Sequence, residues 1–220
     1  MPDACFDSVA IDFIGLLPEE DGKDMIMTIT DTLGADICLV PTHSKWTTAQ
    51  VAVALFDNWY CENGLMLHLI SDRDALFTSE LWAAFIKLTG VKLKMLTSYH
   101  PKTDGASERT NKTLVQLIHY HVNVNQKGWL AQLPRVHFAI MNTVNTSTGF
   151  SPFQLKSGHS PRIIPPLIPL PDNASEAEIS AAQIVKRIEL DVQAAQDSLM
   201  EAKVRQAYHA NQDRSPEKPY

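Results

Sequence analysis

The sequence predicts an α/β fold in which a mixed five-stranded sheet is flanked by helices. Three strand-like segments separated by short loops open the chain. After residue 47 the hydrophobic residues alternate between helical and strand spacing, and two long helical patterns follow. The resulting order of three strands, helix, strand, helix, strand and two helices contains no internal repeat, and it fits a mixed sheet with helices on both faces.

Composition predicts the three opening strands. Residues 8–16, SVAIDFIGL, are rich in β-branched and aromatic side chains and end near Gly15. A second strand is expected at 25–31, and a third at 36–40, closed by Pro41. The short loops between these strands indicate an antiparallel meander.

Helical spacing begins at residue 47. Val51, Leu55 and Trp59 recur at intervals of four, which predicts a helix over 47–62 with one of its two leading threonines as the cap. Gly90 is a favourable stop for the next helix. The further expected segments are a strand at 67–70, a helix at 79–88, a strand at 91–97, a polar loop at 98–105, and helices at 106–125 and 129–142. The tryptophans expected in the core are Trp59, Trp82 and Trp129.

The chain changes character beyond the predicted core. Residues 163–171, IIPPLIPLP, are too rich in proline for a helix and indicate an extended connector. Ser175 and Glu178 form a capping-box pattern that opens a long C-terminal helix. Its heptad-like apolar stripe suits packing on its own domain and a dimer contact equally well. The expected divisions are 1–162 for the core, 163–174 for the connector, 175–212 for the helix and 213–220 for a tail.

Composition indicates a soluble globular protein in a reducing compartment. Hydrophobic residues make up 45% of the chain and charged residues 20%. Neither a membrane-spanning apolar run nor a secretory signal is visible. The three cysteines have no metal-ligand spacing, so neither a disulfide framework nor a zinc site is expected.

Charge is distributed unevenly along the chain. The formal net charge is −6, which by itself argues against a nucleic-acid partner. Residues 1–60 carry ten acidic residues against two lysines, whereas residues 98–171 carry seven basic residues against Asp104 and Glu108. The basic region therefore surrounds one of the candidate catalytic residues.

Three carboxylates lie within or at the ends of predicted strands and helices. Asp12 lies within an otherwise apolar strand, where an ionised acid is costly unless it is paired or bound to a metal. Asp72 follows a predicted strand, and Glu108 opens a predicted helix. Each residue alone has an ordinary explanation, namely local hydrogen bonds for Asp12, a turn or cap for Asp72, and the helix dipole for Glu108.

The spacing of the three acids favours a shared site. The 35 residues between Asp72 and Glu108 contain one helix, one strand and one loop, which is the length needed to return a helix start to the strand end. Asp12 on the first, central strand would complete a cluster of acids. Such a cluster needs cations to offset its repulsion, and hard oxygen ligands select Mg²⁺ or Mn²⁺.

Several longer motifs follow one another in the chain. They are AIDFIGLLP, ISDRDALFTSELW, TSYHPKTDGASERTNKTL, GWLAQLP and NTSTGFSPFQLKSG. Together they resemble the integrase region of gypsy-type long-terminal-repeat retrotransposon polyproteins, within the retroviral integrase superfamily. The resemblance covers about residues 5–165, and more loosely the helix to about 214, and it implies a ribonuclease-H-like core followed by the long helix.

The resemblance also implies an activity. Asp12, Asp72 and Glu108 would be both the catalytic and the metal-binding residues, holding two Mg²⁺ or Mn²⁺ ions. The implied enzyme is a metal-dependent polynucleotidyl transferase or nuclease, which uses water for DNA 3′-end processing and a DNA 3′-hydroxyl for strand transfer. The expected nucleic-acid contacts are Tyr99, His100, Lys102, Arg109 and Lys112.

Partners and location follow from the same resemblance. The expected partners are retrotransposon ends, target DNA and other copies of the chain, with RNA left open and no membrane. Action in the nucleus is expected, with cytoplasmic assembly left open. Asn111 resembles a family residue that orients either Glu108 or the substrate, and the sequence does not decide between them.

The chain departs from the family pattern in several places. Full integrases carry an upstream zinc module and a downstream β-barrel or chromodomain, and neither is visible here. Basic residues are absent from TLGADICLVP, and Met66 stands where many relatives have proline. These departures favour a fragment of a larger polyprotein.

Two other functions stay open from the sequence. The chain could be an inactive or co-opted integrase-fold fragment that serves as a nucleic-acid-binding or protein-interaction module. A ribonuclease-H nuclease acting on RNA–DNA hybrids would share the fold, although the motifs resemble integrase throughout.

Overall fold

A five-stranded mixed sheet forms the centre of the protein, in the strand order β3-β2-β1-β4-β5. The computed structural model describes residues 4–72, 74–95, 111–118, 127–145, 148–162 and 174–212. The strands are β1 (Ser8–Ile14), β2 (Met25–Asp31), β3 (Ile37–Thr42), β4 (His68–Ser71) and β5 (Lys92–Met95). The helices are α1 (Thr48–Leu55), the π-helical turn η1 (Phe56–Tyr60), α2 (Cys61–Asn63), α3 (Glu80–Thr89), α5 (Trp129–Asn142), α6 (Pro152–Ser157) and α7 (Glu176–Gln212), and residues 111–118 are also helical.

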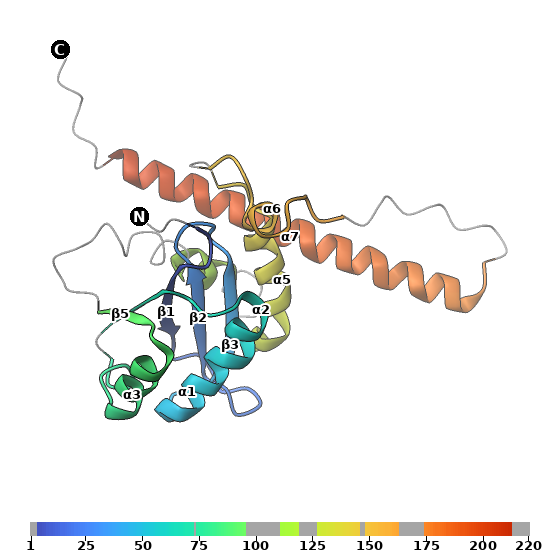
Figure 1. Ribbon diagram of the computed structural model, residues 1–220. Coiled ribbons are helices and arrows are strands. Elements are labelled where there is room, and N and C mark those ends of the chain that lie inside the picture. The colour runs from blue at the N-terminus through green and yellow to red at the C-terminus, as the bar shows by residue number, and fades with distance from the viewer. Residues whose placement is uncertain are drawn as a thin grey trace, which may run out of the picture. The chain divides into compact units, whose positions relative to one another are not determined.

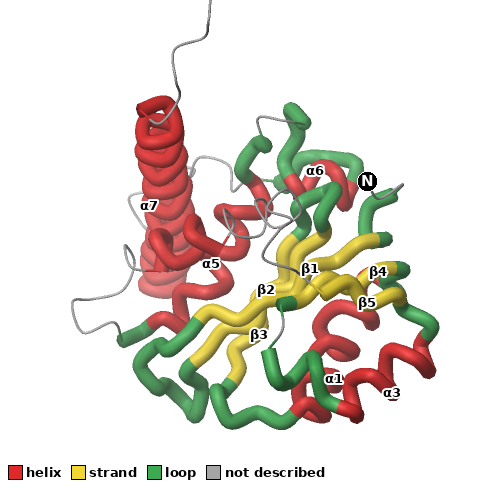
Figure 2. Tube along the Cα trace, turned by 90° about the vertical axis from the view of Figure 1, so that its left-hand side faces the viewer, coloured by secondary structure: helices red, strands yellow, loops and turns green. Residues whose placement is uncertain are grey.

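The first three strands form the predicted antiparallel meander, and β4 and β5 extend it in parallel. β1 pairs antiparallel with β2 and parallel with β4, so it is the central strand. Helices α1 and α3 lie on one side of the sheet and α5 lies on the other (Figures 1 and 2). The predicted fold class, a mixed sheet flanked by helices, is therefore confirmed.

The prediction that Pro41 closes the third strand is wrong. Pro41 lies inside β3 and pairs with Ile26. Proline has no backbone N–H to donate, but β3 is an edge strand with only one neighbour in the sheet. An edge strand hydrogen-bonds to a neighbour on one side only, so about half of its backbone N–H and C=O groups need no partner strand. The strand β3 can therefore continue through the proline to Thr42.

Local capping signals set the helix starts, and the predicted threonine cap of the first helix is Thr47. Thr47 caps α1 in a capping box with Gln50, and Ser79 caps α3 by accepting from the Trp82 N–H. Gly90 ends α3 in the left-handed conformation, with φ of 73°. The predicted helix over 47–62 is present, but its middle turn is π-helical between α1 and α2.

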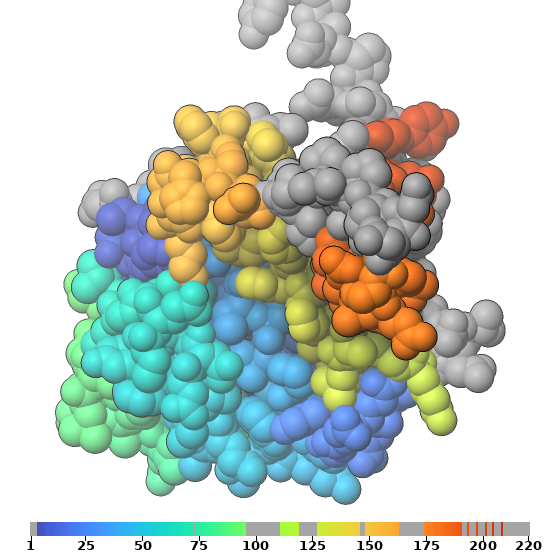
Figure 3. Space-filling model, turned by 90° about the vertical axis from the view of Figure 1, so that its right-hand side faces the viewer, coloured from blue at the N-terminus to red at the C-terminus, as the bar shows by residue number. Residues whose placement is uncertain are grey.

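The main hydrophobic core lies between the sheet and the helices α1 and α3. Val9, Ile11, Met27 and Ile29 contribute the strand residues of this cluster. Trp59, Trp82 and Trp129 are fully buried, as predicted. On the face shown in Figure 3, α5 and α6 lie side by side.

Contacts within the chain divide it into two compact units, Met1–Pro161 and Arg162–Tyr220. The predicted capping box opens α7: Glu178 Oε2 accepts from the Ser175 N–H at 2.7 Å, and Ser175 Oγ accepts from the Glu178 N–H at 3.3 Å. The predicted connector at 163–171 and the tail lie outside the described residues. No helix in the described part of the chain is both long and apolar enough to cross a membrane.

Candidate active site

Asp12 points to the face of the sheet opposite the main hydrophobic core. Val9 and Ile11 belong to the core cluster, and Phe13 packs against it. Since side chains alternate between the two faces of a strand, the intervening Asp12 faces the other way. Its side chain is half-buried. The alternation explains how an acid can occupy an otherwise apolar central strand.

The parallel pairing of β1 with β4 runs toward both Asp12 and Asp72. Its register ends with Ala10 opposite Ile70. Asp12 lies two residues further along β1, and Asp72 directly follows the end of β4. Both acids therefore lie toward the same end of two adjacent parallel strands, where ligand sites of α/β sheets lie.

Each of these carboxylates uses one oxygen for a local hydrogen bond. Asp12 Oδ1 accepts from the Phe13 N–H at 2.8 Å, and Asp72 Oδ1 accepts from the Asp74 N–H at 3.1 Å. The ordinary roles that the sequence left open for these residues, a local hydrogen bond and a turn, are thus present. A carboxylate offers about four lone-pair sites on its two oxygens, so each of these local bonds is compatible with further contacts.

Asn111, at the start of the described helix 111–118, holds the second oxygen of Asp12. Its side-chain Nδ2–H donates to Asp12 Oδ2 at 2.6 Å. Leu114, Leu117 and Ile118 of the same helix are buried, which anchors the helix to the protein. The sequence left the partner of Asn111 open between Glu108 and substrate, and the structure shows a contact with Asp12.

Several predicted site residues cannot be placed. Glu108 lies three positions before Asn111 and outside the described residues, and the same holds for Tyr99, His100, Lys102 and Arg109. Lys112 is described, and it is exposed directly after Asn111 in the chain. The structure therefore joins Asn111 to Asp12, while the grouping of Asp12, Asp72 and Glu108 as one triad stays a prediction.

The described donors suit a hard divalent cation. The carboxylates of Asp12 and Asp72 offer the oxygen ligands that Mg²⁺ and Mn²⁺ prefer. The buried Asn111 Oδ1, on the side chain that holds Asp12, has no hydrogen-bond partner among the described residues. Within that part of the chain, which does not include Glu108, no group of three or more His, Cys, Asp or Glu residues could hold a metal ion.

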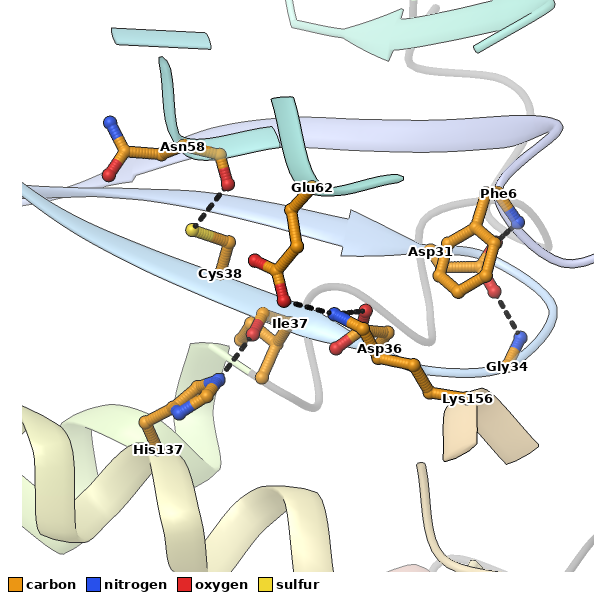
Figure 4. Close-up of polar contacts among 10 residues, drawn as sticks. All are labelled: Phe6, Asp31, Gly34, Asp36, Ile37, Cys38, Asn58, Glu62, His137 and Lys156. Atoms are coloured by element: carbon orange, nitrogen blue, oxygen red, sulfur yellow. Dashed lines mark hydrogen bonds and ion pairs between the residues drawn. The ribbon is translucent and has the colours of Figure 1, made fainter. Parts of the chain in front are cut away.

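A second polar cluster lies beside a cavity that the sequence analysis did not predict. The cavity has a volume of about 520 Å³ and is lined by residues of β3, α2, α5 and α6, but not by Asp12 or Asp72. Figure 4 shows the Lys156 ammonium between Asp36 and Glu62, at 2.9 Å and 2.8 Å. Burial raises the pKa of Asp36, against the opposing effect of Lys156.

The polar groups of this cavity already bind one another. Besides the Lys156 pairs, His137 Nε2 lies 2.8 Å from the Ile37 carbonyl oxygen. A signal for this region was present in the sequence. Ser151 and Gln154 form the capping box that opens α6 and so presents Lys156, a pattern that the sequence analysis did not use.

The chain is similar to known proteins in sequence and in fold. No family model matches the chain. A search of curated proteins finds the Transposon Tf2-3 polyprotein of Schizosaccharomyces pombe (strain 972 / ATCC 24843), 29% identical over 186 residues. The match covers 82% of this chain but only 14% of the polyprotein, so the chain spans a small part of its relative.

Solved structures give the same result for the fold. The HTLV-2 integrase catalytic core domain in complex with magnesium, in its trimeric form, matches with a TM-score of 0.56 and 16% identity, over 70% of this chain and 99% of that one. A chain of the simian T-cell lymphotropic virus intasome, in complex with PP2A regulatory subunit B56 gamma, matches with a TM-score of 0.54 and 18% identity, over 79% and 61%. The chain thus has the ribonuclease-H-like fold of an integrase catalytic core, with retrotransposon polyproteins among its relatives, and the predicted resemblance is confirmed.

Proposed function

We propose that the chain is an integrase catalytic domain that performs divalent-metal-dependent DNA 3′-end processing and strand transfer. The observation that carries this proposal is the parallel pairing of β1 with β4, which supports a shared site because Asp12 lies in β1 and Asp72 directly follows β4. Asn111 supports it, because its bond to Asp12 brings the start of helix 111–118 to the same place. Glu108 lies one helical turn before Asn111 in the sequence.

The proposed roles follow from the chemistry of these groups. Asp12, Asp72 and Glu108 would hold two Mg²⁺ or Mn²⁺ ions, which supply activation of a water or 3′-hydroxyl and stabilisation of the leaving oxygen. The carboxylates themselves are hard, anionic ligands that fix such ions beside a phosphodiester. The magnesium complex of the similar HTLV-2 core supports a divalent cation at this site, and the number of ions belongs to the proposal.

DNA contacts are proposed for the basic region beside the site. Lys112 follows Asn111 directly and is exposed, so its ammonium can reach a phosphate next to the carboxylates. The other proposed contacts are Tyr99, His100, Lys102 and Arg109. The acidic first 60 residues would repel DNA, which directs binding to the region around Glu108.

The proposal extends to assembly and location. The similar HTLV-2 core has a trimeric form, and the other neighbour is part of an intasome. We propose that this chain also acts as an oligomer on retrotransposon ends and target DNA, in the nucleus. An RNA partner has no support in the described site.

A disintegration assay tests the proposed activity. The purified chain is incubated in Mn²⁺ with a branched DNA that mimics a strand-transfer product, because the reversal needs only a catalytic core. The wild type should release ligated product, whereas Asp12→Asn, Asp72→Asn and Glu108→Gln should each lose at least ~100-fold in rate, in line with the weight of charge stabilisation in catalysis. Glu19→Gln, at an exposed acid outside the site, should retain the rate and serves as the matched control.

The same samples distinguish the alternative function. A folded wild type that binds the branched DNA equally in EDTA and in Mn²⁺, with no ligated product, would support a nucleic-acid-binding module instead. Product of equal yield from Glu108→Gln would remove the triad from the mechanism.

A further inference from the structure

We propose that Asn111 is a positioning residue of the candidate active site, which orients the Asp12 carboxylate to bind a divalent cation. The inference rests on the proposed function, since it assigns a task within the same site. It goes beyond the triad by naming a neutral side chain that controls how well one of the acids can act as a ligand.

The Asp12 carboxylate accepts hydrogen bonds on both of its oxygens. The Phe13 N–H donates to Oδ1 at 2.8 Å, and Asn111 Nδ2–H donates to Oδ2 at 2.6 Å. The terminal torsion of aspartate is broad, so contacts on both oxygens are needed to fix the plane of the carboxylate. The Asn111 bond restricts this torsion from the second oxygen.

An amide is well suited to this task because it donates without adding charge. A lysine or arginine at the same position would neutralise Asp12 and repel a cation, while an aspartate would repel Asp12 itself. The amide Nδ2–H holds the carboxylate and leaves its negative charge available. The contact therefore arranges the carboxylate and does not compete with a metal ion for its charge.

The other end of the amide argues against a purely packing role. Asn111 Oδ1 is buried and has no hydrogen-bond partner among the described residues. A buried acceptor without a partner is unfavourable, so an apolar side chain of similar size would pack better at this position. The Nδ2–H bond to Asp12 explains why an amide and not an apolar side chain occupies this position. Its Oδ1 can accept a hydrogen bond from a donor that binds in the site.

A matched control exists in α5. Asn142 Nδ2 donates to the Phe138 carbonyl at 2.8 Å, and its Oδ1 is also buried with no partner within the described part of the chain. Asn142 thus resembles Asn111 in having a donating Nδ2 and an Oδ1 without a partner, but among the described residues its acceptor is a backbone carbonyl and not an acid. Replacing it measures what the loss of a half-satisfied asparagine costs in stability alone.

The test measures metal binding without DNA. Mn²⁺ affinity of the purified chain is determined by electron paramagnetic resonance for the wild type, Asn111→Leu, Asn111→Ala, Asn142→Ala and Asp12→Asn, with circular dichroism as the check on folding. Both Asn111 variants should bind Mn²⁺ about 10- to 100-fold more weakly, the range for residues that orient metal ligands. Asn142→Ala should bind as the wild type does.

A second measurement follows the side-chain amide of Asn111 directly and does not require its substitution. In the metal-free protein, the Asn111 side-chain amide signals in a ¹H–¹⁵N spectrum should move on Asp12→Asn, because the acceptor loses its charge. Amide signals that stay in place would overturn the inference even if both Asn111 variants failed to fold.

The outcomes separate this inference from the proposed function. Wild-type Mn²⁺ binding that Asp12→Asn abolishes, but that folded Asn111 variants retain in full, would overturn the role of Asn111 and leave the site intact. Absence of Mn²⁺ binding by the folded wild type would overturn both.

Discussion

Lys156 joins three elements through one ammonium group. It extends from α6 to Asp36, just before β3, and to Glu62 in α2, at 2.9 Å and 2.8 Å. The Asp36 side chain is only 5% exposed, so its charge is costly without a partner. The two hydrogen-bonded acids raise the pKa of Lys156 although its own burial lowers it. The ion pairs of Lys156 with Asp36 and Glu62 therefore hold α6 against the sheet and α2.

Replacing this lysine should destabilise the fold in a pH-dependent way. Lys156→Met leaves Asp36 unpaired and should lower the free energy of unfolding by about 1–3 kcal/mol at neutral pH, the cost of an unsatisfied buried group. The pKa of Asp36 is already raised by burial, and loss of Lys156 should raise it further. A raised pKa favours the protonated folded state, so the destabilisation should shrink as the pH falls through that pKa toward the ordinary value of 3.8.

Urea denaturation between pH 4 and pH 8 measures this effect, with Lys45→Met as the control at an exposed lysine. A destabilisation of equal size at every pH would show that the lysine acts through packing and not through charge.

Lys112 is the described residue best placed to test DNA contact. It is exposed on the helix whose first described residue, Asn111, holds Asp12. Lys112→Ala should weaken binding of duplex DNA of any sequence and reduce the slope of log K against log salt by about 0.9, as expected for one phosphate. Fluorescence anisotropy at several salt concentrations provides the measurement. Lys87→Ala, in the last turn of α3, should leave the slope unchanged, and an unchanged slope for Lys112→Ala would exclude a phosphate contact.

At the scale of elements, α5 begins at a cap supplied from far away in the sequence. The Glu20 carboxylate accepts hydrogen bonds from the Gly128 N–H and, at 3.4 Å, from the Leu130 N–H. Trp129 Nε1 also donates to the Pro18 carbonyl at 2.8 Å. Gly128 itself has a φ of 95° and no side chain to cap the helix. The loop before β2 therefore supplies the N-cap of α5, which in most helices is the side chain of the residue directly before the helix.

This cap predicts a moderate and salt-sensitive effect. Glu20→Gln should lower the free energy of unfolding by about 1 kcal/mol, since it removes a negative charge from a helix N-terminus. The neighbouring Glu19→Gln, at an exposed position, should have little effect. Thermal unfolding in low and in high salt tests both variants, because screening should reduce the Glu20 effect. Equal melting temperatures for the two variants would contradict the capping role.

At the scale of the whole molecule, the first unit contains a complete core. Every buried member of the main cluster lies between Val9 and Val91, and the other buried helix residues in the described part of the chain extend to Pro152 of α6. In the second unit, α7 exposes large side chains, among them Ile184 and Leu190. The first unit, Met1–Pro161, thus has what a chain needs to fold alone.

Removing the second unit should therefore leave the core folded. A chain ending at residue 162 should unfold cooperatively, with a free energy of unfolding within about 1 kcal/mol of the full chain, as expected for an independent domain. Urea titration followed by tryptophan fluorescence measures it, because Trp59, Trp82 and Trp129 are all buried in the first unit. A truncated chain without a cooperative transition would show that α7 is part of the core.

Much of the architecture could be predicted because its signals are local. Capping residues such as Thr47 and Ser79, the stop at Gly90 and the three buried tryptophans depend on neighbours within a few positions. The prediction failed where strand pairing in the sheet outweighs the local preference of a residue. Pro41 was expected to end a strand, and only the edge position of β3 makes it acceptable.

The sequence by itself determined most of the elements, their order and the resemblance to retrotransposon integrases, and it proposed Asp12, Asp72 and Glu108 as one site. The tertiary structure decided which residues meet. The parallel pairing sets β1, which contains Asp12, beside β4, which Asp72 follows, while Asn111 reaches Asp12 across 99 positions and Glu20 caps α5 across 108. The physical reason is that capping and periodicity act over a few residues, whereas strand register and side-chain contacts between distant segments arise only when the whole sheet has formed.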